Sequence, residues 1–285
     1  MNTLPPIQRN KHSGSPSVFT PEALLREARR QKGLQARSVP EICILDPDGD
    51  IARHLKTAKR ATQVESWPCY HTDLLSFDME GLSLGIVACA VGAPFAVLIA
   101  EELFACGCRL LISVTSAGQI RAVREPPYFI IIDRALRDEG TSYHYLPPGE
   151  YSVADERLAQ LAARSLSRAG IPVEIGASWT TDAPFRETAE AIDAARAAGI
   201  LAVEMEAAAL YAFAEARAHA VLCLAHVTNQ MGQVEGDFEK GASDGAEQSL
   251  RIIRLIANEW RTGKPAPPQS SGGHTMGIAS RLLRR

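Results

Sequence analysis

The stretch AVEMEAAALYAFA, residues 202–214, sets two carboxylates one residue apart directly before an alanine-rich helical pattern. A carboxylate at the end of a buried strand costs free energy unless a donor bonds it, and a position at a helix start offsets only part of that cost. The diol of a sugar would satisfy Glu206. The alternative, for Glu206 and for Glu204, is a helix-start glutamate that water solvates.

Outward from this stretch, short β-branched runs alternate with longer helical patterns. The predicted strands cover 41–45, 82–91, 109–115, 128–133, 173–178 and 220–228, and the predicted helices cover 94–105, 153–170, 186–199, 205–218 and 244–261. This alternation predicts an α/β fold, a single domain with three layers (α/β/α) around a mixed, largely parallel central sheet. Ligands of such sheets gather at the carboxyl ends of the strands.

The two ends of the chain depart from this alternation. A helix that starts at Pro21, after a Thr20 cap, is predicted to be peripheral. We expect residues 1–37 to form an N-terminal extension and residues 38–263 to form the domain. Residues 264–285 are rich in Pro, Ser and Gly, so we expect a flexible tail there.

The composition excludes several classes of function. No apolar run approaches the roughly 20 residues of a membrane span, and the first residues lack the apolar core of a secretory signal, so we expect a cytoplasmic protein. The net charge of −3 gives no field that gathers nucleic acid, although Arg281, Arg284 and Arg285 form one small basic cluster. The six cysteines show no metal-ligand spacing, so they are interpreted as reduced hydrophobic residues and no metal is expected.

Two further loops follow predicted strands and carry small or polar residues. In ACAVGAPFA, Gly92 and Ala93 permit close backbone approach ahead of a helix, although a glycine in this position is often only a turn. In SVTSAGQI, the hydroxyls of Thr115 and Ser116 could hold a phosphate oxygen or a water, or simply form a turn.

Together these motifs resemble the nucleoside phosphorylase superfamily, which includes uridine phosphorylases, bacterial purine nucleoside phosphorylases and methylthioadenosine/adenosylhomocysteine nucleosidases. The motifs GAPFAVLIAEEL (92–103), TSAG (115–118) and VEMEAAAL (203–210) follow the family's order and spacing, and RDEGTSYHYLPP (137–148) is similar to some phosphorylases. The resemblance covers roughly residues 38–262. It implies the nucleoside phosphorylase-like α/β fold.

The resemblance also implies roles around the sugar. In that family the second glutamate of the Glu-Met-Glu triplet binds the ribose hydroxyls and the methionine packs under the sugar, which assigns these roles to Glu206 and Met205. Glu204 has either a ligand-binding or a structural role. Cleavage of an N-glycosidic bond passes through an oxocarbenium-like sugar, so a carboxylate at the 2′-hydroxyl becomes more favourable as positive charge develops.

Other residues are implied at the base and at the 5′ end of the sugar. Asn229 stands where many purine-specific relatives have an aspartate, so it can bond a base without protonating it, or form a turn. Phe185 is expected to stack on a base and Arg186 to reach a carbonyl oxygen, with core packing and a surface position as the alternatives. His144 is expected near the 5′ end, or as a packed histidine.

The chain departs from the family where phosphate binds. Family phosphorylases carry a GDPxR loop after the first strand, and the matching LDPDG, residues 45–49, lacks the arginine. A second family arginine falls at Ser113, and a third has no evident counterpart. Without these bidentate groups, hydrolysis is the alternative, with Ser116 near the water and Asp46 or Asp48 to activate it. A nucleoside-binding protein without turnover is a second alternative.

We therefore expect a nucleoside phosphorylase-like pentosyltransferase acting on a purine or pyrimidine nucleoside, with Glu206, Asn229 and Ser116 as catalytic residues. No cofactor is expected, although phosphate is a possible co-substrate. The resemblance implies a homo-oligomer, a dimer or a hexamer.

Overall fold

The computed structural model of the chain describes residues 5–232 and 235–263. The helices are α1 (Pro21–Lys32), α2 (Asp50–Thr57), α3 (Ala93–Ala105), α4 (Glu156–Arg168), α5 (Ala189–Ala197), α6 (Ala207–Arg217) and α7 (Ala246–Thr262). The short 3₁₀ helices are η1 (Pro6–Gln8), η2 (Ser142–His144), η3 (Pro184–Arg186) and η4 (Ala242–Gly245). The predicted tail, 264–285, lies outside the described residues.

Four parallel strands form the part of the sheet that positions the site. β1 (Ile42–Asp46) pairs in parallel with β4 (Leu82–Ala88) on one side and with β5 (Leu110–Gln119) on the other. β5 in turn pairs in parallel with β10 (Ala220–Asn229). Their carboxyl ends therefore meet at one edge, where ligands of α/β sheets bind.

The remaining strands extend this sheet and close part of it on itself. β10 pairs with β6 (Tyr128–Asp138), β6 with β8 (Glu174–Thr181), β8 with β9 (Ala202–Glu204), and β9 returns to β5. At the other edge, β3 (Leu75–Met79) and β2 (Ala61–Gln63) add antiparallel strands, and β7 (Tyr151–Val153) pairs with β6. The pairings are both parallel and antiparallel, so the sheet is mixed.

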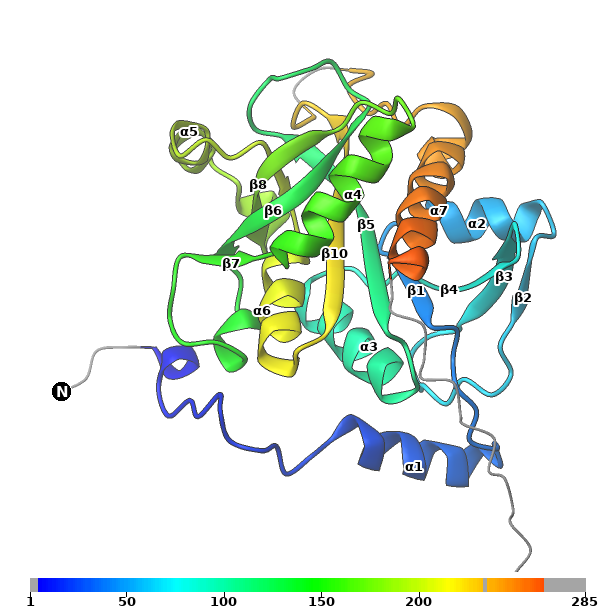
Figure 1. Cartoon of the computed structure of the whole chain (residues 1–285). Helices are drawn as coiled ribbons and strands as arrows, with labels where there is room; N and C mark the ends of the chain where they lie inside the picture. The colour runs from blue at the N-terminus through cyan, green and yellow to red at the C-terminus, as the bar shows by residue number, and fades with distance from the viewer. Residues whose placement is uncertain (1–4, 233–234, 264–285) are drawn as a thin grey trace, which may run out of the picture.

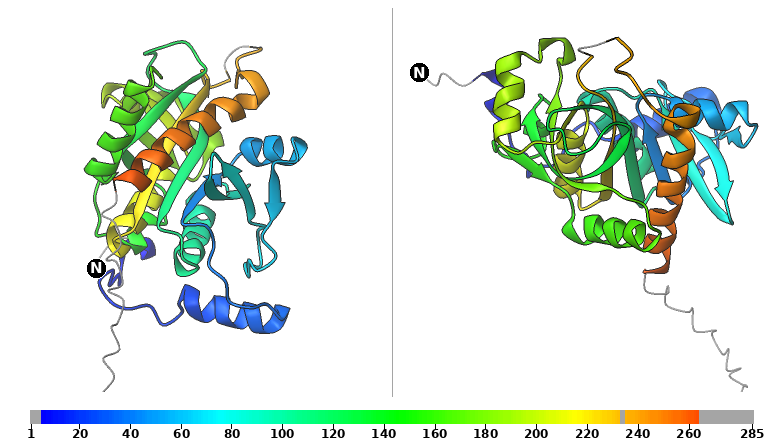
Figure 2. Two further views of the ribbon diagram at one scale, coloured as in Figure 1. Left: turned by 45° about the vertical axis from the view of Figure 1, so that its right-hand side comes forward. Right: turned by 90° about the horizontal axis from the view of Figure 1, so that it is seen from above.

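Helices cover both faces of this sheet (Figures 1 and 2). On one face, α3 and α6 enclose a core that includes Ile99, Leu103, Leu210 and Phe213. On the other face, α2, α4 and α7 enclose a second core that includes Leu55, Leu166 and Ile253. The predicted three-layer α/β arrangement is confirmed.

The N-terminal segment lies across the outside of the α3 and α6 layer (Figure 1). Thr20 caps α1 by accepting a hydrogen bond from the Ala23 amide, as its position before Pro21 predicts. Leu25 of α1 is buried in the same core as α3, so this outer helix contributes apolar contacts to the domain.

Candidate active site

The Glu206 carboxylate lies at the centre of the edge where the parallel strands end. It precedes α6, and the residue is only 1 % exposed. Its Oε1 accepts a 2.7 Å hydrogen bond from the Gly92 amide, and its Oε2 accepts a 2.9 Å bond from Thr115 Oγ1. Burial, together with the neighbouring Glu204 carboxylate, raises the pKa of Glu206 to about 8. With this pKa the group is mostly the neutral acid at pH 7 and becomes the anion as the pH rises through about 8.

Gly92 can present its amide in this way because of its backbone conformation. The residue has φ of 89° immediately before α3, a region that side-chain-bearing residues rarely adopt. Ala93 follows as the first residue of α3 and is fully buried. The glycine-rich turn is therefore a donor to the carboxylate that lies 114 positions later.

The Glu204 carboxylate accepts hydrogen bonds from backbone and side-chain groups of the protein. Its Oε2 accepts 2.7 Å hydrogen bonds from the backbone amides of Glu206 and Ala207, which begin α6. Its Oε1 accepts bonds from the hydroxyls of Ser178 at 2.9 Å and Thr180 at 2.5 Å. Burial raises the pKa of Glu204 and these donors oppose the rise. The two glutamates of the triplet therefore differ, because Glu204 caps the helix that carries Glu206.

Ser116 neighbours Thr115 on β5 and binds a carboxylate of the chain. Its amide donates to Asp48 Oδ2 at 2.7 Å and its hydroxyl donates to Asp48 Oδ1 at 2.5 Å. Asp46, in contrast, is buried and accepts a 2.8 Å hydrogen bond from the Ala52 amide at the start of α2. Of the two aspartates considered from the sequence, Asp48 is the one bonded to Ser116.

Two of the three missing family arginines correspond to positions that the structure describes, Gly49 and Ser113. Gly49 has φ of 76°, and a Cβ there would lie 2.9 Å from Cys89 Sγ, so this turn has no room for a larger residue without a shift. Ser113 is buried in β5, and its hydroxyl has no hydrogen-bond partner in the described part of the chain. Neither position carries positive charge.

Asn229 lies at the carboxyl end of β10, opposite Gly118 of β5. Its Oδ1 accepts a 2.9 Å hydrogen bond from the Met231 amide, and its Nδ2 lies 3.2 Å from Thr228 Oγ1. A Cβ on Gly118 would lie 2.6 Å from Met231 Sδ, which places the Met231 side chain over this glycine. Asn229 forms a turn, as in the alternative interpretation, and still stands at the edge that carries Ser116.

Phe185 and Arg186 lie in η3, both exposed to solvent. Phe185 is 100 % exposed, so it is not part of the core. It lines a cavity of about 580 Å³ together with Ile192 and Met231. Met231 therefore links Asn229 to the Phe185 loop, the connection of residues 182–188 between β8 and α5. The sequence did not indicate this link.

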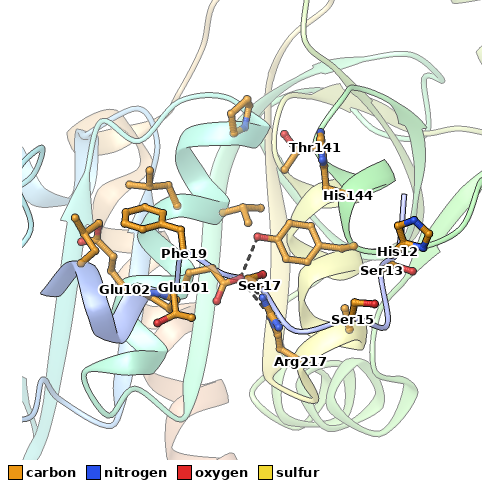
Figure 3. Close-up of a pocket in the computed structure, with 18 residues that line it drawn as sticks. His12, Ser13, Ser15, Ser17, Phe19, Glu101, Glu102, Thr141, His144 and Arg217 are labelled. Carbon is orange, nitrogen blue, oxygen red and sulfur yellow. Dashed lines mark hydrogen bonds and ion pairs between the residues drawn. The ribbon is translucent and has the colours of Figure 1, made fainter. Parts of the chain in front are cut away.

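His144 lies in a different place, under the N-terminal segment (Figure 3). Its Nδ1 is 3.2 Å from Lys11 Nζ, and burial with the Lys11 charge lowers the pKa of His144. It lines a cavity of about 570 Å³ between the N-terminal segment and α3, with Thr141 and Arg217. Glu206, Ser116 and Asn229 do not line this cavity. We therefore place the candidate active site at the hydrogen-bonded carboxylates of Glu206 and Asp48, which can bind sugar hydroxyls, and not at the cavity that His144 lines.

Met205, between the two glutamates, is half-buried, so part of its side chain is accessible.

Within residues 5–232 and 235–263, the side chains of His, Cys, Asp and Glu form no group that could hold a metal ion. The same ranges contain no helix with the length and apolarity needed to cross a membrane.

Comparisons with known proteins agree with this geometry. The family model of the phosphorylase superfamily matches residues 41–258. The chain is 26 % identical over 187 residues to a guanosine phosphorylase of Halorubrum lacusprofundi, covering 63 % of this chain and 77 % of the relative. It is 27 % identical over 199 residues to a uridine phosphorylase of Thermococcus kodakarensis (64 % and 69 % covered), and 24 % identical over 180 residues to a DeoD-type purine nucleoside phosphorylase of Psychromonas ingrahamii (62 % and 75 %). The resemblance in the motifs is thereby confirmed, and the chain belongs to the phosphorylase superfamily.

Proposed function

We propose that this protein is a nucleoside phosphorylase, which cleaves the N-glycosidic bond of a purine or pyrimidine nucleoside and transfers the pentosyl group to phosphate. The superfamily and the names of the relatives support this reaction. The observation that carries it is the Glu206 carboxylate, buried at the carboxyl ends of the parallel strands beside Thr115 and Ser116.

In the proposed reaction the bond between C1′ and the base nitrogen breaks, and its electron pair leaves with the base. An oxygen of hydrogen phosphate then forms the new bond to C1′ and its proton passes to solvent, while the departing base takes up a proton from solvent. The Glu206 carboxylate accepts hydrogen bonds from Gly92 and Thr115, and its remaining lone pairs can accept from ribose hydroxyls. Its negative charge stabilises the sugar cation most strongly when the cation is fully developed, in a site from which water is excluded.

Glu204 acts in this proposal as a positioning residue, because all four of its hydrogen bonds fix the start of α6 and its neighbouring strand. Met205 packs against the sugar. Gly92 supplies its amide to Glu206, and Ala93 permits the close approach of α3.

The base is proposed to lie between Asn229 and the Phe185 loop. The amide nitrogen of Asn229 can donate to a base, although it cannot protonate one. Phe185 supplies an accessible aromatic face and Arg186 an accessible guanidinium, which suits stacking and a carbonyl contact. His144 is not included in this proposed arrangement, because it lines the cavity beside the N-terminal segment, which none of Glu206, Ser116 and Asn229 lines.

Phosphate-independent hydrolysis is a second candidate, favoured by the pairing of Asp48 with Ser116. A carboxylate already occupies the two donors of Ser116, and an aspartate 2.5 Å from a hydroxyl is suited to hold and activate a water. The missing arginines at positions 49 and 113 favour it as well.

The two reactions are separated by measuring base release from a panel of ribonucleosides by enzyme freed of phosphate by dialysis, with and without added phosphate. Phosphorolysis predicts release that saturates with phosphate and yields a pentose 1-phosphate. Equal release without phosphate would replace it by hydrolysis. Binding of a nucleoside without any cleavage would contradict both reactions and favour a binding protein without turnover.

The surroundings of the enzyme are part of the proposal. No cofactor is needed for this chemistry, and phosphate is the co-substrate. We propose a cytoplasmic homo-oligomer, a dimer or a hexamer, with no nucleic-acid or membrane partner; the six free cysteines suit a reducing compartment.

A further inference from the structure

A cluster of charged groups beside Ser116 has no role in the reaction as described so far. Asp50 begins α2, two residues after Asp48. Its Oδ2 accepts a 2.5 Å hydrogen bond from Lys240 Nζ, and its Oδ1 accepts a 2.6 Å bond from Arg53 Nη1. Two cations that are distant in sequence therefore share one carboxylate, next to the aspartate that occupies Ser116.

Lys240 is held close to the strand that neighbours Ser116. A Cβ on Gly245 would lie 2.8 Å from the Lys240 carbonyl oxygen and 2.2 Å from His226 Cε1, so the Lys240 backbone and the His226 ring pack around this glycine. His226 is the cross-strand partner of Ser116 in the β10–β5 pairing. Lys240 lies in the connection after β10, and its ammonium reaches Asp50 at the start of α2, two residues after Asp48.

His226 adds an unpaired polar atom to this cluster. The residue is 5 % exposed, its ring stacks on Phe129 at 4.4 Å, and its Nε2 has no hydrogen-bond partner among the described residues. Burial and the Lys240 charge lower the pKa of His226 to about 4, so the imidazole is neutral at physiological pH. It can therefore accept or donate a hydrogen bond without adding charge.

Lys240 itself is charged and faces the acidic groups. Burial lowers the pKa of its ammonium, but the hydrogen bond to Asp50 and the charges of Asp48 and Asp50 outweigh that effect and raise it overall. Its side chain is 28 % exposed, against 61 % for Arg53, which also approaches Asp244 at 3.9 Å. Lys240 is the more deeply placed of the two cations.

The two hydrogen bonds from Ser116 to Asp48 indicate which kind of ligand Ser116 can bind. The amide and the hydroxyl of Ser116 bind two oxygens of one carboxylate, as they would bind two oxygens of a free oxyanion. A phosphate could not use these donors while Asp48 holds them, and the negative charge of Asp48 would repel it. Phosphate binding at Ser116 therefore requires that Asp48 be displaced and that a cation offset the negative charge of the phosphate.

We infer that Lys240 is the cation that binds the phosphate co-substrate, and that Asp48 occupies the phosphate position on Ser116 until phosphate displaces it. This inference rests on the proposed phosphorolysis. The hydrogen bond to Asp50 keeps the Lys240 ammonium near Asp48. Replacement of Asp48 by phosphate on Ser116 exchanges hydrogen bonds only, and no covalent bond forms or breaks. Since Asp48 and Asp50 offset the charges of Lys240 and Arg53, the wild-type chain should bind phosphate weakly.

The test is a calorimetric titration of the full chain with inorganic phosphate, for the wild type and the variants Asp48→Ala, Lys240→Met and Arg53→Met. Lys240→Met should weaken phosphate binding by roughly tenfold or more, since it removes a charge-assisted contact. Asp48→Ala should tighten it by a similar factor, because it frees both Ser116 donors. Arg53→Met is the matched control: it removes the other partner of Asp50, and affinity should change less than about threefold.

The inference is overturned if Lys240→Met binds phosphate as the wild type does, if Arg53→Met weakens binding equally, or if Asp48→Ala gives no tightening. Asp48→Asn, which keeps the size of the side chain, gives the same comparison if Asp48→Ala does not fold. Base release is measured separately. Phosphate binding that follows the prediction with cleavage that ignores phosphate would contradict phosphorolysis alone. Phosphate-dependent cleavage with normal binding by Lys240→Met would contradict the Lys240 assignment alone.

Discussion

Glu206 and Gly92 lie 114 positions apart, and a 2.7 Å hydrogen bond from the glycine amide to the carboxylate joins them. The bond connects the start of α6 to the turn before α3, across the edge where β4, β1, β5 and β10 end. It also requires the positive φ of Gly92. The site is therefore produced by the sheet topology, which brings these loops together.

The first prediction concerns the pH dependence of activity. Burial raises the pKa of Glu206 to about 8, and the proposed role requires the anion. For a nucleoside whose base does not titrate between pH 6 and 9, kcat/KM should rise about tenfold per pH unit below 8 and level off above it. A profile that is flat over this range would show that Glu206 ionisation does not control the reaction.

The second prediction concerns stability. A carboxyl group whose pKa is higher in the folded protein than in the unfolded chain stabilises the fold fully at low pH, and this stabilisation is lost as pH rises from about 4.5 through the folded pKa of about 8. Glu206→Gln removes this titration, and its amide can serve Gly92 and Thr115 as the protonated acid does. Between pH 5 and pH 9, denaturant unfolding should show a smaller fall in unfolding free energy for this variant, by on the order of 4 kcal/mol. Parallel curves would contradict the raised pKa.

The third prediction separates the two glutamates. Glu204→Ala leaves two buried hydroxyls and the first amides of α6 without their acceptor, so the free energy of unfolding should fall by about 3 kcal/mol. Glu204→Gln is the control, since its oxygen can still accept from the amides while its NH₂ group donates to the hydroxyls. The control should lose less than half as much in urea unfolding. A Glu204→Ala variant of unchanged stability would remove the capping role.

The fourth prediction concerns the base side. An alanine at Gly118 would place its Cβ 2.6 Å from Met231 Sδ, so the flexible methionine has to move. The same Cβ would lie 3.2 Å from Val203 Cγ1 and 3.3 Å from Asn229 Oδ1, so these side chains have to shift slightly as well. We expect Gly118→Ala to raise the KM for the nucleoside severalfold with a slightly lowered melting temperature. Gly14→Ala is the control, because a Cβ at Gly14 meets no atom within 4 Å. An unchanged KM in Gly118→Ala would place the base away from Met231.

Much of the fold could be predicted from the sequence, because the long elements carry strong patterns. The six predicted strands, the peripheral helix predicted at Pro21 and the five other predicted helices are all present, with ends shifted by a few residues. The three-residue strands β2, β7 and β9, the short helix α2 and the strand β3 were not predicted. Three residues are too few to show an alternating pattern, whereas the alternation of LSFDM in β3 is a signal that could have identified that strand. The pairing of β10 with both β5 and β6 depends on tertiary contacts that no single apolar run encodes.

Some residues of the candidate site could be predicted from the sequence motifs, and others were found only in the structure. The motifs indicated Glu206, Thr115 and Ser116, and these residues lie together. Met231 and Lys240 were not indicated, because they lie in the connection after β10, which has no helical or strand pattern up to η4. Their positions depend on contacts with Gly118 and Asp50, which are far away in sequence.

The central claim is that the Glu206 carboxylate faces the 2′-hydroxyl and stabilises the sugar cation. The most direct test is kcat/KM of wild type and Glu206→Gln on one ribonucleoside and on its 2′-deoxy analogue, with saturating phosphate. We predict a loss of roughly a hundredfold or more on the ribonucleoside and a clearly smaller loss on the deoxy analogue. Equal losses on both substrates, or no loss on the ribonucleoside, would contradict the claim.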